Sequence, residues 1–239
     1  MTDLTPDEVE TNEPEPRLAR LAILISGRGS NCMSIAQAIR EGRLTGCEIA
    51  VVVCNIPGAL GIETARSLGL SVVTLEGRGR EQRDHEEAIS ALLRKFRVDL
   101  ICMAGYRRVL STGFVRQWKG RILNIHPSLL PAFPGRDAPQ QALDYGARVT
   151  GCTVHFVDEH SDSGTIILQR VVEIYDEDEE SSLFRRLLAA QHVAYSEGIQ
   201  LVLSGEYEAQ GRRYVHREEQ YPADESDSSA AQQHGLEAN

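Results

Sequence analysis

The chain has 239 residues, 41% of them hydrophobic and 25% charged, so it can bury a sizeable core and its composition excludes wholesale disorder. No apolar run approaches the ~20 residues of a membrane-spanning helix, and no secretion signal opens the chain, so we expect a cytoplasmic protein that does not enter a membrane. The formal net charge is −10, from 25 basic and 35 acidic side chains.

The acidic excess lies at the two ends of the sequence. Residues 1–17 and residues 217–239 each carry six acids and one base, and removing both ends leaves 23 charges of each sign. Segments this polar cannot bury enough apolar surface to order themselves. We therefore predict disordered acidic tails over 1–17 and 217–239 around one folded domain, 18–216. The neutral body argues against a broad nucleic-acid surface.

The cysteines indicate a reducing compartment. There are five, an odd number, and they form no C-x-x-C pair. Most lie in apolar surroundings, which is typical of reduced, buried thiols.

In the first part of the domain, short apolar runs alternate with longer stretches of helical spacing. Strands that are apolar nearly throughout and separated by helices pair in parallel and are covered on both faces, so we infer an α/β fold with a doubly wound sheet. The expected strands are 21–26, 48–55, 71–75, 98–103 and 121–125, and the expected helices are 31–41, 60–68, 81–96 and a short one before 121.

Beyond Pro127 the sequence predicts a different local structure. Residues 130–139 are rich in Pro and Gly and should form a loop. The elements expected after it are a short helix over 140–146, strands over 149–157 and 165–175, a long helix capped by Ser181 or Ser182 and stopping at Gly205, and a hairpin over 206–216 that turns at Gln210 and Gly211.

The first candidate site is Gly27-Arg28-Gly29-Ser30-Asn31, between the first strand and the first helix. Two glycines allow a sharp turn whose N–H groups, together with the helix dipole, suit a phosphate. Cys32 stands where a dinucleotide fingerprint has its third glycine, and the second strand ends in Cys54-Asn55 without an acid for a ribose, which disfavours a nicotinamide cofactor. A plain tight turn is the structural alternative.

The second candidate site is Asn124-Ile125-His126-Pro127, at the end of the fifth strand. Side chains two apart on a strand point the same way, so Asn124 and His126 should project together where open α/β sheets bind ligands. An amide beside an imidazole can stabilise a developing oxyanion. The alternative is a hydrogen-bonded histidine at the end of a strand.

Two further segments could complete a site. In the polar loop 157–164, a carboxylate could orient an imidazole or pass a proton through water. One alternative is a solvated acidic loop. The other is a metal site formed by His155, Asp158, His160 and Asp162. We disfavour metal because successive strand residues alternate faces and no further cluster offers ligands. The small residues of 103–110 leave room for a flat ligand, although its two arginines could equally be surface charges.

Together these segments resemble the folate-dependent glycinamide ribonucleotide formyltransferases of purine synthesis. The resemblance covers about residues 20–215. It rests on ISGRGSN from Ile25, AGYRRVL from Ala104, LNIHPSLLPAFPG from Leu123, and VTGCTVHFVDEHSDSG from Val149 to Gly164. It implies a mainly parallel sheet of seven strands with a long C-terminal helix and hairpin.

The resemblance also implies roles for individual residues. Asn124, His126 and Asp162 would be the catalytic set, using 10-formyltetrahydrofolate as cosubstrate and no metal. The substrate-binding residues would be Gly29, Ser30, Asn31 and Gln191. The folate-binding residues would be Arg83, Arg108, Val109, Leu110, Val157 and Asp158.

The implied reaction is attack of the neutral glycinamide amine on the formyl carbon. Asn124 and protonated His126 would donate to the formyl oxygen, and Asp162 would hold the imidazole and relay the amine proton through water.

Several positions depart from the pattern of that family, and they affect substrate detail more than reaction type. Gln191 replaces a glutamate that commonly touches the ribose. The other departures are Arg107 for Met, Asp137 for His, Ser161 for an apolar residue and Thr165 for Pro.

The alternatives share the chemistry or the scaffold. They are a sugar-nucleotide formyltransferase, a tRNA formyltransferase, a formyltetrahydrofolate hydrolase and a non-catalytic nucleotide-binding relative. A tRNA formyltransferase would normally carry a further C-terminal domain, and a formyltetrahydrofolate hydrolase would normally begin with a regulatory domain. We expect glycinamide ribonucleotide and reduced folate as ligands, no nucleic-acid or membrane partner, and leave a homodimer open.

Overall fold

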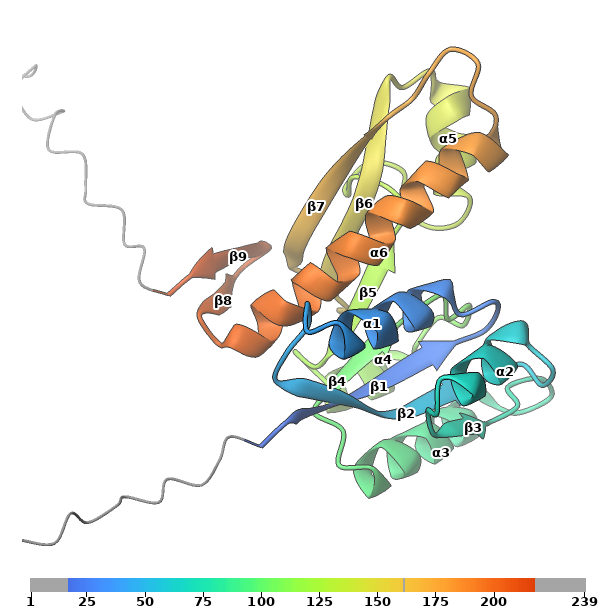
Figure 1. Ribbon diagram of the computed structural model, residues 1–239, viewed down its shortest axis with the longest axis vertical. Helices are drawn as coiled ribbons and strands as arrows, with labels where there is room; N and C mark the ends of the chain where they lie inside the picture. The colour runs from blue at the N-terminus through green and yellow to red at the C-terminus, as the bar shows by residue number, and fades with distance from the viewer. Residues whose placement is uncertain (1–16, 161, 218–239) are drawn as a thin grey trace, which may run out of the picture.

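A computed structural model describes residues 17–160 and 162–217, so the predicted tails, apart from Arg17 and Arg217, lie outside the described residues. Nine strands in this part form one sheet in the order β3-β2-β1-β4-β5-β6-β7-β9-β8 (Figure 1). The strands are β1 Ala19–Ile25, β2 Cys47–Cys54, β3 Val72–Thr74, β4 Leu100–Met103, β5 Ile122–His126, β6 Val149–Phe156, β7 Ile166–Glu173, β8 Tyr207–Gln210 and β9 Arg213–His216.

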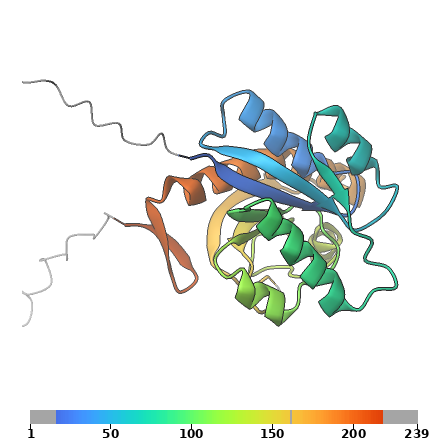
Figure 2. The same cartoon turned by 90° about the horizontal axis from the view of Figure 1, so that it is seen from below.

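The helices lie in two layers, one on each face of the sheet (Figure 2). They are α1 Ser30–Arg40, α2 Leu60–Ser67, α3 Gln82–Lys95, α4 Thr112–Gln117, α5 Ala138–Tyr145 and α6 Glu180–Ser204. Strand β1 shows why both faces are covered. Its residues Leu21, Ile23 and Ile25 join a core with α1, α2 and α6, whereas Ala22 and Leu24 join a core with α3 and α4.

The predicted doubly wound, mainly parallel sheet is confirmed. Strands β3, β2, β1, β4 and β5 pair in parallel, and β6 and β7 follow in antiparallel pairing. The seven predicted strands correspond to β1–β7. The predicted hairpin β8–β9 extends the sheet because β9 pairs with β7 at one position, Ile166 with Arg213.

Two predicted helix starts are wrong by about two residues. The N-cap of α6 is Glu179 rather than Ser181 or Ser182, because a capping box joins the Glu179 carboxylate to the N3 backbone and the Ser182 hydroxyl to the Glu179 N–H. Helix α5 begins at Ala138, within the predicted loop, because Pro139 lacks only an N–H that the first helical turn does not use.

The parallel strands end at one edge of the sheet, which brings distant segments together there. Strands β1, β4 and β5 are neighbours in register, with Leu24 beside Met103 and Met103 beside Asn124. The backbone N–H of Arg107, after β4, donates to the Ser26 hydroxyl, after β1, at 2.9 Å. The loops that follow these strands therefore lie side by side.

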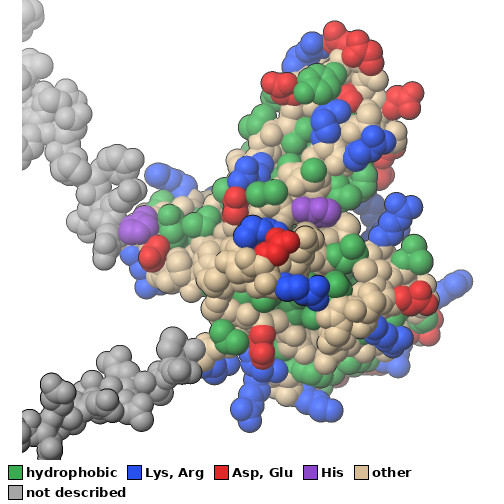
Figure 3. Space-filling model, in the orientation of Figure 1, with side chains coloured by type: hydrophobic (Ala, Val, Ile, Leu, Met, Phe, Trp, Pro, Cys, Tyr) green, Lys and Arg blue, Asp and Glu red, His purple; other side chains and the backbone are tan. Residues whose placement is uncertain are grey.

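The visible surface mixes charges of both signs. Figure 3 shows blue and red side chains interspersed over the face that carries α1 and α6. Within the described residues, no helix is both long and apolar enough to span a membrane.

Candidate active site

A cavity of about 690 Å³ opens at the C-terminal ends of β4 and β5. It brings together residues from the end of β5, the loop after β4, the loop before α5 and the loop between β6 and β7. Its polar lining includes Arg107, Arg108, Asn124, His126, Arg136, Asp137, His155, Asp158, Glu159, His160 and Asp162. A second cavity of about 720 Å³ lies under the β8–β9 hairpin and shares residues 157–160 with the first. The first is the candidate active site, because all three predicted catalytic side chains line it.

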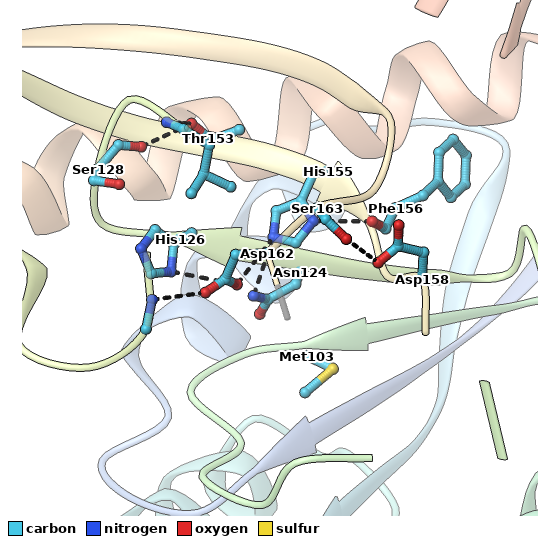
Figure 4. A network of polar contacts seen from close by, with 12 residues as sticks. Met103, Asn124, His126, Ser128, Thr153, His155, Phe156, Asp158, Asp162 and Ser163 are labelled. Carbon is cyan, nitrogen blue, oxygen red and sulfur yellow. Dashed lines mark hydrogen bonds and ion pairs between the residues drawn. The ribbon is translucent and has the colours of Figure 1, made fainter. Parts of the chain in front are cut away.

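The amide of Asn124 is held by a histidine on the neighbouring strand. Asn124 on β5 pairs with His155 on β6, and Nδ2 of Asn124 lies 3.3 Å from Nε2 of His155 (Figure 4). On its other side, Nδ1 of His155 lies 2.9 Å from the carbonyl oxygen of Phe156. A neutral imidazole with its proton on Nδ1 donates to Phe156 and accepts from Asn124. One N–H of the Asn124 amide is thus engaged and the second remains for a ligand.

Burial favours this neutral form of His155. The ring is 2% exposed, and burial lowers its pKa, against smaller raising effects from the Phe156 carbonyl and Asp162. The tautomer follows from the geometry, because the Phe156 carbonyl can only accept a hydrogen bond.

Both ring nitrogens of His126 face oxygen atoms. Nε2 lies 2.9 Å from the carbonyl oxygen of Phe133, and Nδ1 lies 3.6 Å from Oδ1 of Asp162. A doubly protonated ring would have an acceptor on each side. The Nδ1 distance exceeds that of a normal hydrogen bond, so a proton on Nδ1 is available to a ligand oxygen, whereas Nε2 is already engaged.

Asp162 lies between the two histidines. Its Oδ1 is 3.6 Å from Nδ1 of His126 and 3.7 Å from Nε2 of His155, and its Oδ2 accepts a hydrogen bond from the backbone N–H of Gly135 at 2.9 Å. Its side chain is 10% exposed. The Asp162 carboxylate and the Phe133 carbonyl face the two ring nitrogens of His126. The backbone φ angles of Asp162 and Phe133 are 54° and 51°. Such left-handed residues cost energy and cluster at functional sites.

The predicted folate-binding residues fall in two places. Arg108, Val109, Leu110, Val157 and Asp158 line the cavity. Arg83 does not line it: its side chain is 84% exposed on α3 and forms an ion pair with Glu87 at 2.9 Å.

Contacts with α3 and the loop before it hold the residues after β4. The Arg108 guanidinium donates to the Gly77 carbonyl, Gln82 donates to the Val109 carbonyl at 3.0 Å, and His85 lies 3.0 Å from the Tyr106 hydroxyl. Burial raises the pKa of Tyr106 to about 12, so this phenol stays protonated at neutral pH.

The predicted phosphate loop lies at the start of α1, outside the wall of this cavity. Gly29 is the N-cap of α1 with φ 73°, a value that favours glycine. Nδ2 of Asn31 donates to Oε1 of Gln191 on α6 at 3.1 Å, so the structure joins two of the predicted substrate-binding residues. Oδ1 of Asn31 is buried without a hydrogen-bond partner among the described residues.

Of the other departures from the family pattern, Arg107 and Asp137 line the cavity, whereas Thr165 does not. Asp137 is the N-cap of α5 with φ 54°, and the Thr165 hydroxyl donates to the Gly211 carbonyl at 2.8 Å. Ser161 lies outside the described residues. Among residues 17–160 and 162–217, no group of three or more His, Cys, Asp and Glu side chains could hold a metal ion.

The comparisons with known proteins agree on one family. The formyl transferase family model matches residues 19–199. A phosphoribosylglycinamide formyltransferase of Bacillus subtilis (strain 168) is 37% identical over 187 residues, which cover 78% of this chain and 95% of that protein. The crystal structure of glycinamide ribonucleotide transformylase 1 from Symbiobacterium toebii superposes with a TM-score of 0.81 at 40% identity, covering 83% of this chain and 94% of that chain.

Other relatives are much longer. The trifunctional purine biosynthetic protein adenosine-3 of Homo sapiens is 41% identical over 192 residues, 80% of this chain. The match spans 19% of that protein and 14% of its Drosophila melanogaster counterpart.

Proposed function

The chain belongs to the formyl transferase family, and from this premise we propose that it transfers the formyl group of 10-formyltetrahydrofolate to the amine of glycinamide ribonucleotide. The products are formylglycinamide ribonucleotide and tetrahydrofolate, and the reaction is a step of de novo purine biosynthesis. The observation that carries the proposal is the row of groups Asn124, His155, Asp162 and His126, each 3.3–3.7 Å from the next.

The donors in this row suit the charge that acyl transfer creates. As the amine nitrogen bonds to the formyl carbon, negative charge develops on the formyl oxygen. The unengaged N–H of Asn124 and the Nδ1 proton of His126 can both donate to that oxygen, and Asp162 stabilises the charged imidazole.

The proton balance assigns a second task to Asp162. The amine loses a proton when it forms the new C–N bond, and the folate nitrogen gains one when its bond to the formyl carbon breaks. A carboxylate with a water molecule can accept the first proton and deliver the second. The 10% exposure of Asp162 is consistent with contact to water.

The ligands fit different parts of the edge. We assign the folate to the cavity walls formed by 108–110 and 157–158, the ribonucleotide phosphate to the loop 27–31, and the ribose to Gln191, which Asn31 of that loop contacts. The N–H groups at the start of a helix bind anions. Asn31 Oδ1 supplies a buried acceptor for a ligand donor.

The cytoplasmic location is proposed from the cysteines. All five are free and buried, as expected in a reducing compartment. The absence of a nucleic-acid or membrane partner stays a prediction of the sequence.

The test is formyl transfer between the two substrates. We expect equal amounts of formylglycinamide ribonucleotide and tetrahydrofolate, measured by mass spectrometry, and no product from an Asn124→Ala/His126→Ala double variant. Three controls separate the alternatives: omission of the ribonucleotide, which reveals folate hydrolysis, and its replacement by an amino-sugar nucleotide or by methionyl-tRNA. Transfer to one of the replacement acceptors alone, or hydrolysis alone, contradicts the proposal.

A further inference from the structure

The first turn of α2 touches the loop assigned to the phosphate. The backbone N–H of Gly61 donates to the carbonyl oxygen of Gly27 at 3.0 Å. Gly61 is the second residue of α2, so its N–H is one of the first four of the helix, which have no acceptor within it. Figure 1 shows α2 beside the end of β1, where this contact lies.

This hydrogen bond fixes the orientation of a peptide group in the loop. The carbonyl of Gly27 points at α2, and because the peptide group is planar and trans, the N–H of Arg28 points away from α2. An anion site needs carbonyl oxygens turned away from the anion and N–H groups turned toward it. The contact with Gly61 keeps one carbonyl of the loop turned aside.

The approach is so close that no side chain fits at position 61. A Cβ added to Gly61 would lie 2.7 Å from the Gly27 oxygen, 2.9 Å from Cδ1 of Ile25 and 3.2 Å from the carbonyl carbon of Arg28. Two of these three atoms belong to the loop backbone, and Ile25 is fully buried. A Cβ on Gly29 would in turn lie 3.2 Å from Cα of Gly61. The helix and the loop therefore meet backbone to backbone.

We propose that Gly61 is a positioning residue for the phosphate of the substrate, holding the loop 27–31 in its anion-binding shape from the side of α2. The inference rests on the proposed function and deepens it. Independent support for a nucleotide beside this loop comes from Asn31, which is 7% exposed and whose amide oxygen has no partner within the described residues. This oxygen can accept a hydrogen bond from a donor group next to the phosphate, such as a ribose hydroxyl. Gly61 does not line the cavity that holds Asn124, His126 and Asp162, so its effect is confined to the nucleotide.

The test compares two exchanges of glycine for alanine. Gly61→Ala forces the loop away from α2. The matched control is Gly113→Ala, at the second position of α4, where the added Cβ would lie 3.7 Å from the Ser111 hydroxyl, an ordinary contact distance.

We expect Gly61→Ala to raise the KM for glycinamide ribonucleotide and the inhibition constant of inorganic phosphate at least ~10-fold, about 1.4 kcal/mol. The KM for folate and kcat at saturating nucleotide should stay within about twofold, and Gly113→Ala should leave all four constants unchanged.

A second readout keeps this inference separate from the proposed function. Inorganic phosphate should raise the melting temperature of the wild-type protein, and of Gly113→Ala, more than that of Gly61→Ala, whichever formyl acceptor the enzyme uses. If the wild type does not formylate glycinamide ribonucleotide, the proposed function fails, and this phosphate comparison still decides the role of Gly61.

Two results overturn the proposal. One is a Gly61→Ala variant whose KM for glycinamide ribonucleotide and inhibition constant for phosphate are unchanged. The other is a rise in the KM for folate as large as the rise in the KM for the nucleotide. If Gly61→Ala does not fold, the double variant Gly61→Ala/Ile25→Val takes its place. It removes the clash with Cδ1 of Ile25 and keeps the clash with the Gly27 oxygen. The same kinetic constants are then measured on the double variant.

Discussion

The imidazole of His155 orients the amide of Asn124 across the junction of β5 and β6, with Nε2 of the ring 3.3 Å from Nδ2 of the amide. The Phe156 carbonyl fixes the ring from its other side, at 2.9 Å from Nδ1. His155, which the sequence suggested only as an alternative metal ligand beside the polar loop, therefore determines which way the Asn124 amide points.

The first prediction concerns this contact. His155→Phe removes the acceptor of the Asn124 amide, which can then rotate, and we expect kcat to fall about 10-fold, equivalent to about one net hydrogen bond. His155→Gln offers a side-chain oxygen as a replacement acceptor and should restore much of the loss. Steady-state kinetics at saturating substrates measure both. Full activity in His155→Phe, or no recovery in His155→Gln, would contradict the orienting role.

The second prediction concerns His126 and Asp162. In the proposed mechanism, His126→Ala removes a donor to the formyl oxygen, and Asp162→Asn removes the carboxylate that stabilises the imidazolium and accepts the proton. Each should lower turnover at least ~100-fold while the protein remains folded. Single-turnover kinetics measure the chemical step and circular dichroism checks the fold. Near-wild-type turnover in either variant would remove that residue from its assigned role.

The third prediction is a loss of stability in mild acid. Burial lowers the pKa values of His85, His155 and His192, so below their usual pKa of about 6.5 the unfolded chain binds more protons than the folded one. Above about pH 6.5 both states are neutral at these positions and the effect vanishes. The free energy of unfolding should therefore decrease as the pH falls from about 7.5 to about 5.5, measured by urea denaturation.

His192 provides the control for this prediction. Its Nε2 is buried without a partner in the described part of the chain, so His192→Leu removes one proton-binding site of the unfolded state. The variant should show a shallower loss of stability over the same pH range. An identical slope would mean that His192 does not contribute.

The fourth prediction concerns the packing of α6 on the sheet. A Cβ on Gly198 would lie 2.7 Å from Cγ1 of Val154 on β6. Gly198→Ala should overpack this contact and lower the free energy of unfolding by about 1–3 kcal/mol. In a double-mutant cycle, Val154→Ala should offset part of that loss, because it removes the clashing methyl groups. Strictly additive effects would show that the two residues do not compete for space.

Local sequence predicted the elements well because their signals lie within a few residues. Alternation along β5 placed Asn124 and His126 on one side of the strand, and apolar strands separated by helices predicted parallel pairing. The start of α6 was misplaced because Ser182 caps the helix from within its first turn, a role that depends on the geometry of Glu179.

By itself, the sequence determined the alternation of strands and helices, the edge of the sheet to which we assign the ligands, and the chemical types of the proposed oxyanion donors Asn124 and His126, since these depend on periodicity and on side chains close together in the chain. Tertiary structure alone decided that β6 lies antiparallel beside β5, which sets His155 opposite Asn124, and that Asp162 reaches both histidines. It also decided that α2 meets the loop 27–31 through Gly61. Apart from the contact of Asp162 with His155, seven positions away, these contacts join residues more than thirty positions apart. Such pairings form only when separate elements pack, so no local pattern encodes them.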